Sequence, residues 1–197
     1  MTQDQRVAAI LNAARDVFLE RGFAAARVED VAKRAGIAKG TVYLHFESKD
    51  ALFKALIASV AKAPIAHMEA LLRDEATSST DILRAMIGII RREVLESDRR
   101  NILRLLMTEG PHFPDIAAYH HDAVVARAMA LLRAIVERGV KRGEFANDGL
   151  ARFPQLFAAP LLLAIVWEAL FGAIDPLDVE GLLETHLDVM LNGIRAR

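Results

Sequence analysis

Apolar residues along this chain recur at intervals of three and four, the spacing that places side chains on one face of a helix. The first such stretch predicts a helix over residues 3–21, with its apolar stripe at Val7, Ile10, Leu11, Ala14 and Phe18. Gly22 follows and suits the left-handed backbone conformation that commonly ends a helix. The chain therefore opens on an amphipathic helix with a defined end.

The same pattern continues to the end of the chain. It predicts helices over residues 28–35, 39–46, 49–64, 82–96, 101–108, 115–142, 149–171 and 179–194. Ser48 is expected to cap the fourth helix and Thr80 or Asp81 the fifth, while Pro64 is expected to kink or end the fourth. Because valine and isoleucine also follow helical spacing, the pattern predicts an all-α fold.

Composition supports this fold, since the apolar half of the chain is dominated by alanine and leucine, which lose little rotamer freedom in a helix. The chain has no cysteine, which excludes disulfides, thiolate nucleophiles and cysteine-based zinc sites. The net charge is −1, but residues 1–55 hold nine basic against seven acidic side chains, or +2, leaving −3 for the rest. A small basic region on a near-neutral chain is typical of a sequence-specific DNA reader, although an ordinary solvated face has the same charge pattern.

Residues 28–49 carry the candidate function. Their apolar positions have the spacing that packs two short helices across a turn at Gly36, where glycine tolerates a positive φ. The face left outward on the second helix consists of Lys39, Gly40, Thr41, Tyr43, Leu44 and His45. Hydrogen-bond donors beside a glycine suit a helix that enters the DNA major groove. Lys49, at the start of the next helix, is within reach of a flanking phosphate.

The order of these residues resembles the headpiece of the TetR/AcrR family of regulators. The resemblance covers about the first quarter of the chain without gaps, through Ile10–Ala14, Phe18, Gly22–Phe23, Val28–Ala32, Ala35–Ile37, Lys39–Tyr43, His45–Phe46, Ser48–Lys49 and Leu52–Phe53. It implies a three-helix helix-turn-helix headpiece over residues 1–50, joined to a C-terminal helical domain over residues 51–197. The C-terminal domain would bind an effector and form the dimer.

The resemblance also implies which residues contact DNA. The family's usual positions fall on Lys39, Gly40, Thr41, Tyr43, His45 and Lys49. Tyr43, His45 and Lys49 are expected to meet the sugar-phosphate backbone, and Lys39, Thr41 and Leu44 the base edges. The family usually has threonine or serine just before its second helix, whereas this chain has Ala26 and Arg27. The cap there is expected to be weak, with Arg27 a candidate phosphate contact instead.

For the C-terminal domain, the resemblance implies a homodimer through the last two helices. The last helix offers an apolar stripe at Leu183, Leu187, Met190, Leu191 and Ile194. Residues 161–167 are apolar on all sides and are expected to bury both faces. The candidate effector pocket is apolar with one polar point, and its predicted lining is Met86, Met107, His121, Phe157 and Trp167. Plain core packing is the alternative for each of these side chains.

Other classes of protein are less consistent with the sequence. His112, His120 and His121 lack the i, i+4 spacing of a metal site, so no metal and no cofactor are expected. Without a glycine-rich phosphate loop or a His-Glu-x-x-His motif, no enzyme is expected. Pro160 and Glu168 interrupt the apolar stretch 156–174, so we expect a cytoplasmic protein without a membrane span. The main expectation is a repressor released from a palindromic operator by a small apolar effector; an activator, or control by a protein partner, is the alternative.

Overall fold

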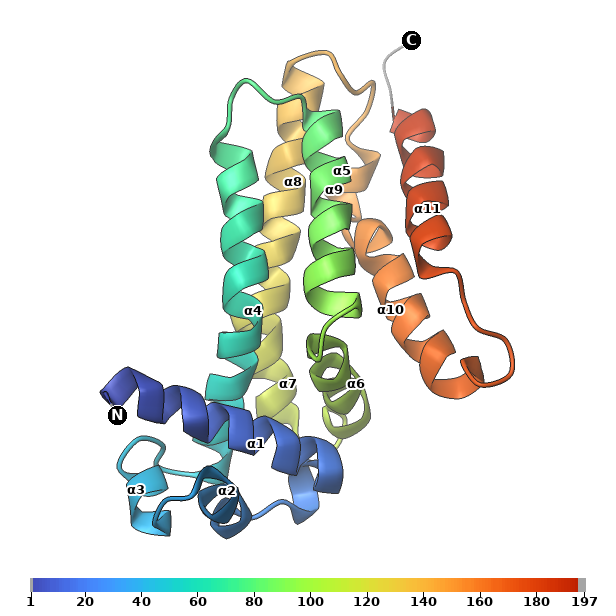
Figure 1. Cartoon of the computed structure of the whole chain (residues 1–197). Coiled ribbons are helices and arrows are strands. Elements are labelled where there is room, and N and C mark those ends of the chain that lie inside the picture. Colours follow the sequence, from blue (N-terminus) through green and yellow to red (C-terminus); the bar gives the residue numbers. More distant parts are fainter. Residues whose placement is uncertain (1, 195–197) are drawn as a thin grey trace. The chain divides into compact units, whose positions relative to one another are not determined.

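The computed structural model describes residues 2–194, and in this range the chain contains helices and no strand (Figure 1). In chain order the helices are α1 (Gln3–Ala25), α2 (Val28–Ala35), α3 (Lys39–Tyr43), α4 (Lys49–Arg73), α5 (Ser79–Ile89), α6 (Arg99–Glu109), α7 (Pro114–His120), α8 (Ala126–Lys141), α9 (Gly149–Arg152), α10 (Gln155–Phe171) and α11 (Val179–Ile194), with π-helical segments η1 (Ile90–Leu95) and η2 (His121–Val125). The all-α prediction is confirmed.

The helices form two compact units that are each discontinuous in sequence. The first comprises Met1–Lys62 and Asn101–Val124, and the second Ala63–Arg100 and Val125–Arg197. The chain passes from one unit to the other within α4, again near the start of α6, and a third time within η2. The boundary at residue 50 inferred from the sequence separates proposed functions and remains a prediction.

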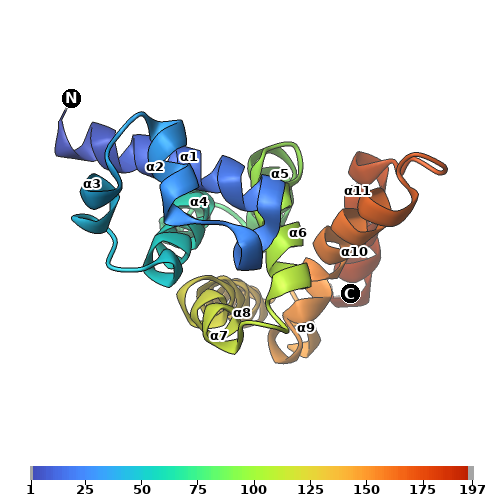
Figure 2. The same cartoon turned by 90° about the horizontal axis from the view of Figure 1, so that it is seen from below.

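An aromatic cluster forms the centre of the first unit. Phe18 and Phe23 of α1 and Phe53 of α4 have ring centroids 4.8–5.7 Å apart, and Phe113 meets Phe23 edge-on at 4.7 Å. Gly22 makes this possible, because its positive φ of 72° turns the chain inside α1 and brings Phe23 back onto the core. The view of Figure 2 shows α2 beside α1, and α3 follows beside α2 in this unit.

In the second unit, α5 packs against α8 and α11, and α10 packs against α11 (Figure 1). The end of α8 holds the loop between α4 and α5, since Arg138 donates hydrogen bonds to the carbonyls of Leu72 (3.1 Å) and Asp74 (2.9 Å). Glu144 accepts a hydrogen bond of 2.6 Å from the backbone N–H of Ser79. A carboxylate at a helix N-terminus complements the helix dipole, so Glu144 fixes the first turn of α5.

Several element boundaries differ from the sequence-based expectation, among them the helix expected over 115–142, which the π-helical segment η2 divides into α7 and α8. Pro64 does not end α4, because the helix continues to Arg73 and buries Ile65 and Met68. Ser78, and neither Thr80 nor Asp81, caps α5, with its hydroxyl accepting from the N–H of Asp81. The helix expected over 149–171 is broken before Pro154, since the residue preceding a proline avoids helical backbone angles.

The apolar stripe of α11 also has a different role from the one expected. Of this stripe, Leu183, Leu187, Leu191 and Ile194 are buried inside the second unit of a single chain, and Met190 is half-buried. They therefore build its own core, which corrects the expectation that they face a partner subunit. The exposed apolar positions lie mainly on α10 instead, at Leu156, Leu162, Leu163, Val166, Leu170 and Phe171.

Within the described residues, α4 has the length and apolar composition that could cross a membrane. Such a helix is weak support for a span, because a core helix of a globular protein meets the same criterion. The beginning of α4 is part of a core helix, since Leu52 and Phe53 are fully buried in the first unit.

Candidate nucleic-acid interface

A tight turn joins α2 to α3. Gly36 adopts the left-handed conformation with φ 68° and ψ 31°, and the N–H of Ile37 donates to the carbonyl of Ala32 at 3.0 Å. This bond satisfies a carbonyl that the end of α2 would otherwise leave without a partner. The predicted glycine turn is confirmed, and it fixes where α3 begins.

Helix α3 is anchored on one side and open on the other. Val42 is completely buried, whereas Tyr43 is 43% exposed and the next residue, Leu44, is 84% exposed. Lys39 and Gly40 are also exposed, and Thr41 and His45 are half-buried. The outer side of α3 and the residue that follows it are therefore open to solvent, with the aromatic side chain of Tyr43 and the apolar side chain of Leu44 next to each other. The helix ends at Tyr43, earlier than the residue 46 expected from the sequence.

Lys39 is paired across the helix-turn-helix with Glu29 of α2, and its ammonium lies 5.7 Å from the centre of the Tyr43 ring. The hydrogen bond from Lys39 lowers the pKa of the Glu29 carboxyl, and the same contact raises the pKa of Lys39. Glu29 was absent from the residues expected from the sequence. Its separation of ten positions from Lys39 matches no helical repeat, so only the folded turn shows the pairing.

Other basic side chains of the first fifty residues are also engaged. Arg34 binds Glu20 through two hydrogen bonds of 2.6 and 2.8 Å, and Arg21 binds Asp30 at 2.6 Å. These pairs tie α1 to α2 and reduce the positive potential expected from counting charges. The basic region is therefore narrower than the sequence indicates.

Lys49 has a structural role that the sequence did not predict. Its ammonium donates to the carbonyls of Phe23 (2.7 Å) and Ala24 (3.0 Å) and lies 4.6 Å from the centre of the Phe23 ring. An ammonium has three N–H donors, so one remains for a phosphate.

Arg27 is exposed and makes no side-chain hydrogen bond to the N-terminus of α2, which confirms the weak cap.

The five residues predicted to line an effector pocket have different surroundings. Met86 and Phe157 are fully buried in the second unit. Trp167, in the same unit, donates from Nε1 to the carbonyl of Asp175 at 2.8 Å. Met107 and His121 belong to the first unit, where both are exposed. As the lining of one pocket, the five remain a prediction.

A two-helix turn that buries Val42 and exposes the outer side of α3, joined to a second helical unit, defines a helix-turn-helix DNA-binding regulator. Comparison with known proteins agrees with this class. Residues 10–56 match the family model for bacterial regulatory proteins of the tetR family, and residues 72–185 match the tetracyclin repressor-like C-terminal domain. The second match alone covers more than half of the chain, so the chain belongs to the TetR family. Members of this family are DNA-binding transcription factors and not enzymes.

Individual relatives are more distant. The HTH-type transcriptional regulator UidR of Escherichia coli is 33% identical over 55% of this chain and 54% of its own length. The chain thus matches only about half the length of this relative. The HTH-type transcriptional repressor BepR of Brucella suis is 28% identical over 80% of this chain and 75% of its own length. The crystal structure of FadR from Bacillus subtilis in complex with stearoyl-CoA matches with a TM-score of 0.76 and 18% identity, covering 95% of this chain and 99% of that one, which shows the shared fold.

Proposed function

We propose that the chain is a cytoplasmic repressor that binds a palindromic operator as a homodimer, with α3 of each subunit in the major groove. The observation that carries this proposal is the contrast between buried Val42 and exposed Tyr43 on α3, together with exposed Leu44 directly after it. The buried side chain of Val42 fixes the helix on the first unit. The open side can then present hydrogen-bond donors and the apolar side chain of Leu44 to base edges.

The proposed contacts divide by chemistry. Thr41 and Leu44 are the candidates for base edges, Leu44 through contact with a thymine methyl group. Tyr43, His45, Lys49 and Arg27 are the candidates for phosphates, which position the protein but carry no sequence information. Lys39 would exchange its contact with Glu29 for DNA. Gly40 leaves open space where the backbone of α3 approaches, because even an added Cβ would meet no atom within 4 Å there.

A homodimer is supported by the surface of α10. Leu163, Val166 and Leu170 follow one another at three- and four-residue spacing and are 47%, 38% and 64% exposed in the single chain. A contiguous apolar stripe of this kind is typical of a subunit interface. Pairing two such chains would supply the two headpieces that a palindromic site requires.

Release by a small, largely apolar effector is the last part of the proposal. Its support comes from relatives: BepR is a repressor, and the FadR structure that shares this fold holds stearoyl-CoA. The candidate pocket residues remain Met86, Met107, His121, Phe157 and Trp167.

The proposal can be tested by selecting bound DNA from a random pool with the full chain. Binding of the selected site is then measured by fluorescence anisotropy against a scrambled site. We expect L44A and Y43A to weaken binding at least about tenfold, the range of one good base or phosphate contact. The control H112A, an exposed change in the same unit, should bind normally. Adding apolar compounds to the complex should then identify an effector that releases DNA. A chain that prefers no DNA sequence would contradict the proposal.

A further inference from the structure

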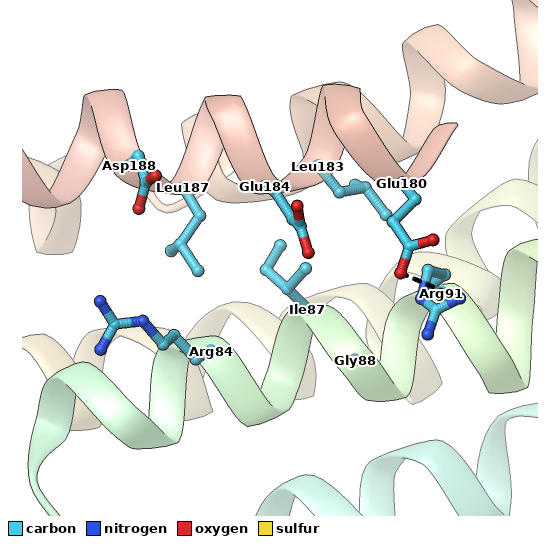
Figure 3. Close-up of a pocket in the computed structure, with 9 residues that line it drawn as sticks. All are labelled: Arg84, Ile87, Gly88, Arg91, Glu180, Leu183, Glu184, Leu187 and Asp188. Atoms are coloured by element: carbon cyan, nitrogen blue, oxygen red, sulfur yellow. Dashed lines mark ion pairs between the residues drawn. The ribbon is translucent and has the colours of Figure 1, made fainter. Parts of the chain in front are cut away.

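A groove of about 350 Å³ runs between α5 and α11 in the second unit (Figure 3). Its floor is apolar and consists of Ile87, Leu183 and Leu187, each no more than 6% exposed. None of the residues expected to line an effector pocket takes part in it. The groove is therefore a feature separate from the predicted pocket.

The two walls of the groove carry opposite charges. Arg84 of α5 and Arg91 of η1 form one wall, and α11 presents Glu180, Glu184 and Asp188 at four-residue spacing on the other. At one end Arg91 closes the groove, with its guanidinium 3.5 Å from Glu180 and 2.8 Å from Glu96. The pair with Glu96 spans five residues, the spacing that the π-helical turn η1 brings to one face.

At the other end of the groove, charged side chains retain unused capacity for hydrogen bonds and ion pairs. Figure 3 shows Arg84 and Asp188 at this end, on opposite walls. Among the described residues, Arg84 forms one ion pair, a contact of 3.3 Å with Asp81 on its own helix, and its side chain is 49% exposed. Glu184 and Asp188 are exposed and make no side-chain hydrogen bond or ion pair within residues 2–194. The site therefore has one guanidinium and two carboxylates with free capacity, beside an apolar floor.

These charges restrict what the groove can hold. A ligand with only a negative charge would be repelled by Glu184 and Asp188, and a ligand with only a positive charge would be repelled by the guanidinium of Arg84. A molecule with both charges satisfies both walls, because a guanidinium binds a carboxylate through two parallel hydrogen bonds and the carboxylates accept from an ammonium. Ile87 and Leu187 are almost fully buried beneath these groups, so the charges on the two walls, and not the floor, select the ligand.

We propose that this groove binds a free α-amino acid. The ligand carboxylate lies on Arg84, its ammonium lies between Glu184 and Asp188, and its side chain lies along the groove. A volume of about 350 Å³ accommodates a molecule of this size. The site goes beyond the proposed function, since binding here does not depend on whether the ligand releases DNA.

The test measures binding by calorimetry to the full chain without DNA, so that its outcome is independent of operator binding. The probes are L-leucine, 4-methylpentanoate, which lacks the ammonium, and 3-methylbutylamine, which lacks the carboxylate. We expect leucine to bind at least tenfold more tightly than either analogue. R84Q and E184Q should each weaken leucine binding about tenfold, because each leaves one ligand charge without a partner.

Matched controls are available on α8 of the same unit. Arg133 and Glu137 are exposed and do not line the groove, so R133Q and E137Q should leave leucine binding unchanged. The proposal is overturned if 3-methylbutylamine binds as tightly as leucine, if R84Q and E184Q bind leucine like the parent chain, or if leucine shows no binding at about 10 mM, where even very weak sites begin to fill.

Discussion

His120 ends α7 with most of its ring inside the first unit, and its buried Nδ1 atom has no hydrogen-bond partner among the described residues. Burial lowers the pKa of His120 below the ordinary 6.5, and the neighbouring His121 lowers it further. The folded state therefore holds this imidazole neutral at a pH where the unfolded chain already binds a proton. Protonation of His120 is therefore one route by which acid destabilises the fold.

The sign of the pH dependence follows from the lowered pKa. Below pH 6.5 the unfolded chain binds more protons at His120 than the folded chain, so stability falls as the pH drops from 6.5 toward the folded pKa. In H120F, urea unfolding at pH 7.5 and pH 5.5 should give a smaller difference in unfolding free energy than in the parent chain. H112Q, at an exposed histidine, should keep the parent's difference. An unchanged acid loss in H120F would show that other groups cause it.

His186 of α11 compensates for a proline in the neighbouring helix. Pro160 lacks an N–H, so the carbonyl of Leu156, four residues earlier, lacks the usual helical hydrogen bond from position 160. The Nε2 atom of His186 lies 2.8 Å from this carbonyl oxygen and donates to it. One side chain thereby satisfies the group that Pro160 leaves open and ties α11 to α10.

A double-mutant cycle tests this compensation. H186A should lower the unfolding free energy by about 1 kcal/mol, the usual net contribution of one hydrogen bond. In the P160A background, the N–H of the introduced alanine can bond the Leu156 carbonyl, so H186A should cost clearly less. Urea unfolding of the four proteins gives the coupling energy. Equal costs in both backgrounds would mean that His186 contributes through packing alone.

At the scale of whole elements, much of the fold is predictable because its signals are local. Gly22 and Gly36 take the positive φ expected of them, and Ser48 caps α4 by accepting from the N–H of Ala51 at 3.0 Å. The break before Pro154 also has a local signal, the proline itself. The effect of Pro64 is not local, because packing in the second unit, which the sequence does not display, carries α4 through to Arg73.

The candidate site is predictable to the same extent. The outer face of α3 follows from its short apolar pattern and from family resemblance. The partners of Lys39 and Lys49 do not, because they lie 10 and 26 positions away in the sequence and meet only through the turn and the end of α1. A charge count therefore overstates how much of the basic region is free for DNA.

The pair between α2 and α3 predicts that Glu29 restrains DNA binding. In E29Q the ammonium of Lys39 loses its anionic partner and becomes free for phosphates. Affinity for scrambled DNA should rise more than affinity for the operator, and the salt dependence should steepen by about one counterion. Anisotropy titrations at several salt concentrations measure both effects. E137Q changes the net charge equally but lies on α8, so it should leave both unchanged. A similar gain in E137Q would assign the effect to overall charge.

At the scale of the whole molecule, a single chain leaves its most apolar helix incompletely covered. One side of α10 is buried through Phe157, Ala164 and Ile165, and the other exposes Leu163, Val166 and Leu170. The stripe of α11 that the sequence offered for a partner is used inside the chain. The proposed dimer therefore depends on the exposed side of α10, and burying a valine or leucine side chain there would contribute about 1.5–3 kcal/mol.

Charge placed in this stripe should separate the subunits. In V166D a carboxylate would be buried without a partner in the dimer, so the dimer dissociation constant should rise at least about tenfold. V140D is a matched control, because Val140 of α8 is 37% exposed against 38% for Val166. Analytical ultracentrifugation should find V166D as a monomer at concentrations where the parent chain and V140D are dimers. V166D should also bind the operator more weakly, because a monomer engages one half-site at a time. A V166D dimer as tight as the parent would place the interface elsewhere on the chain.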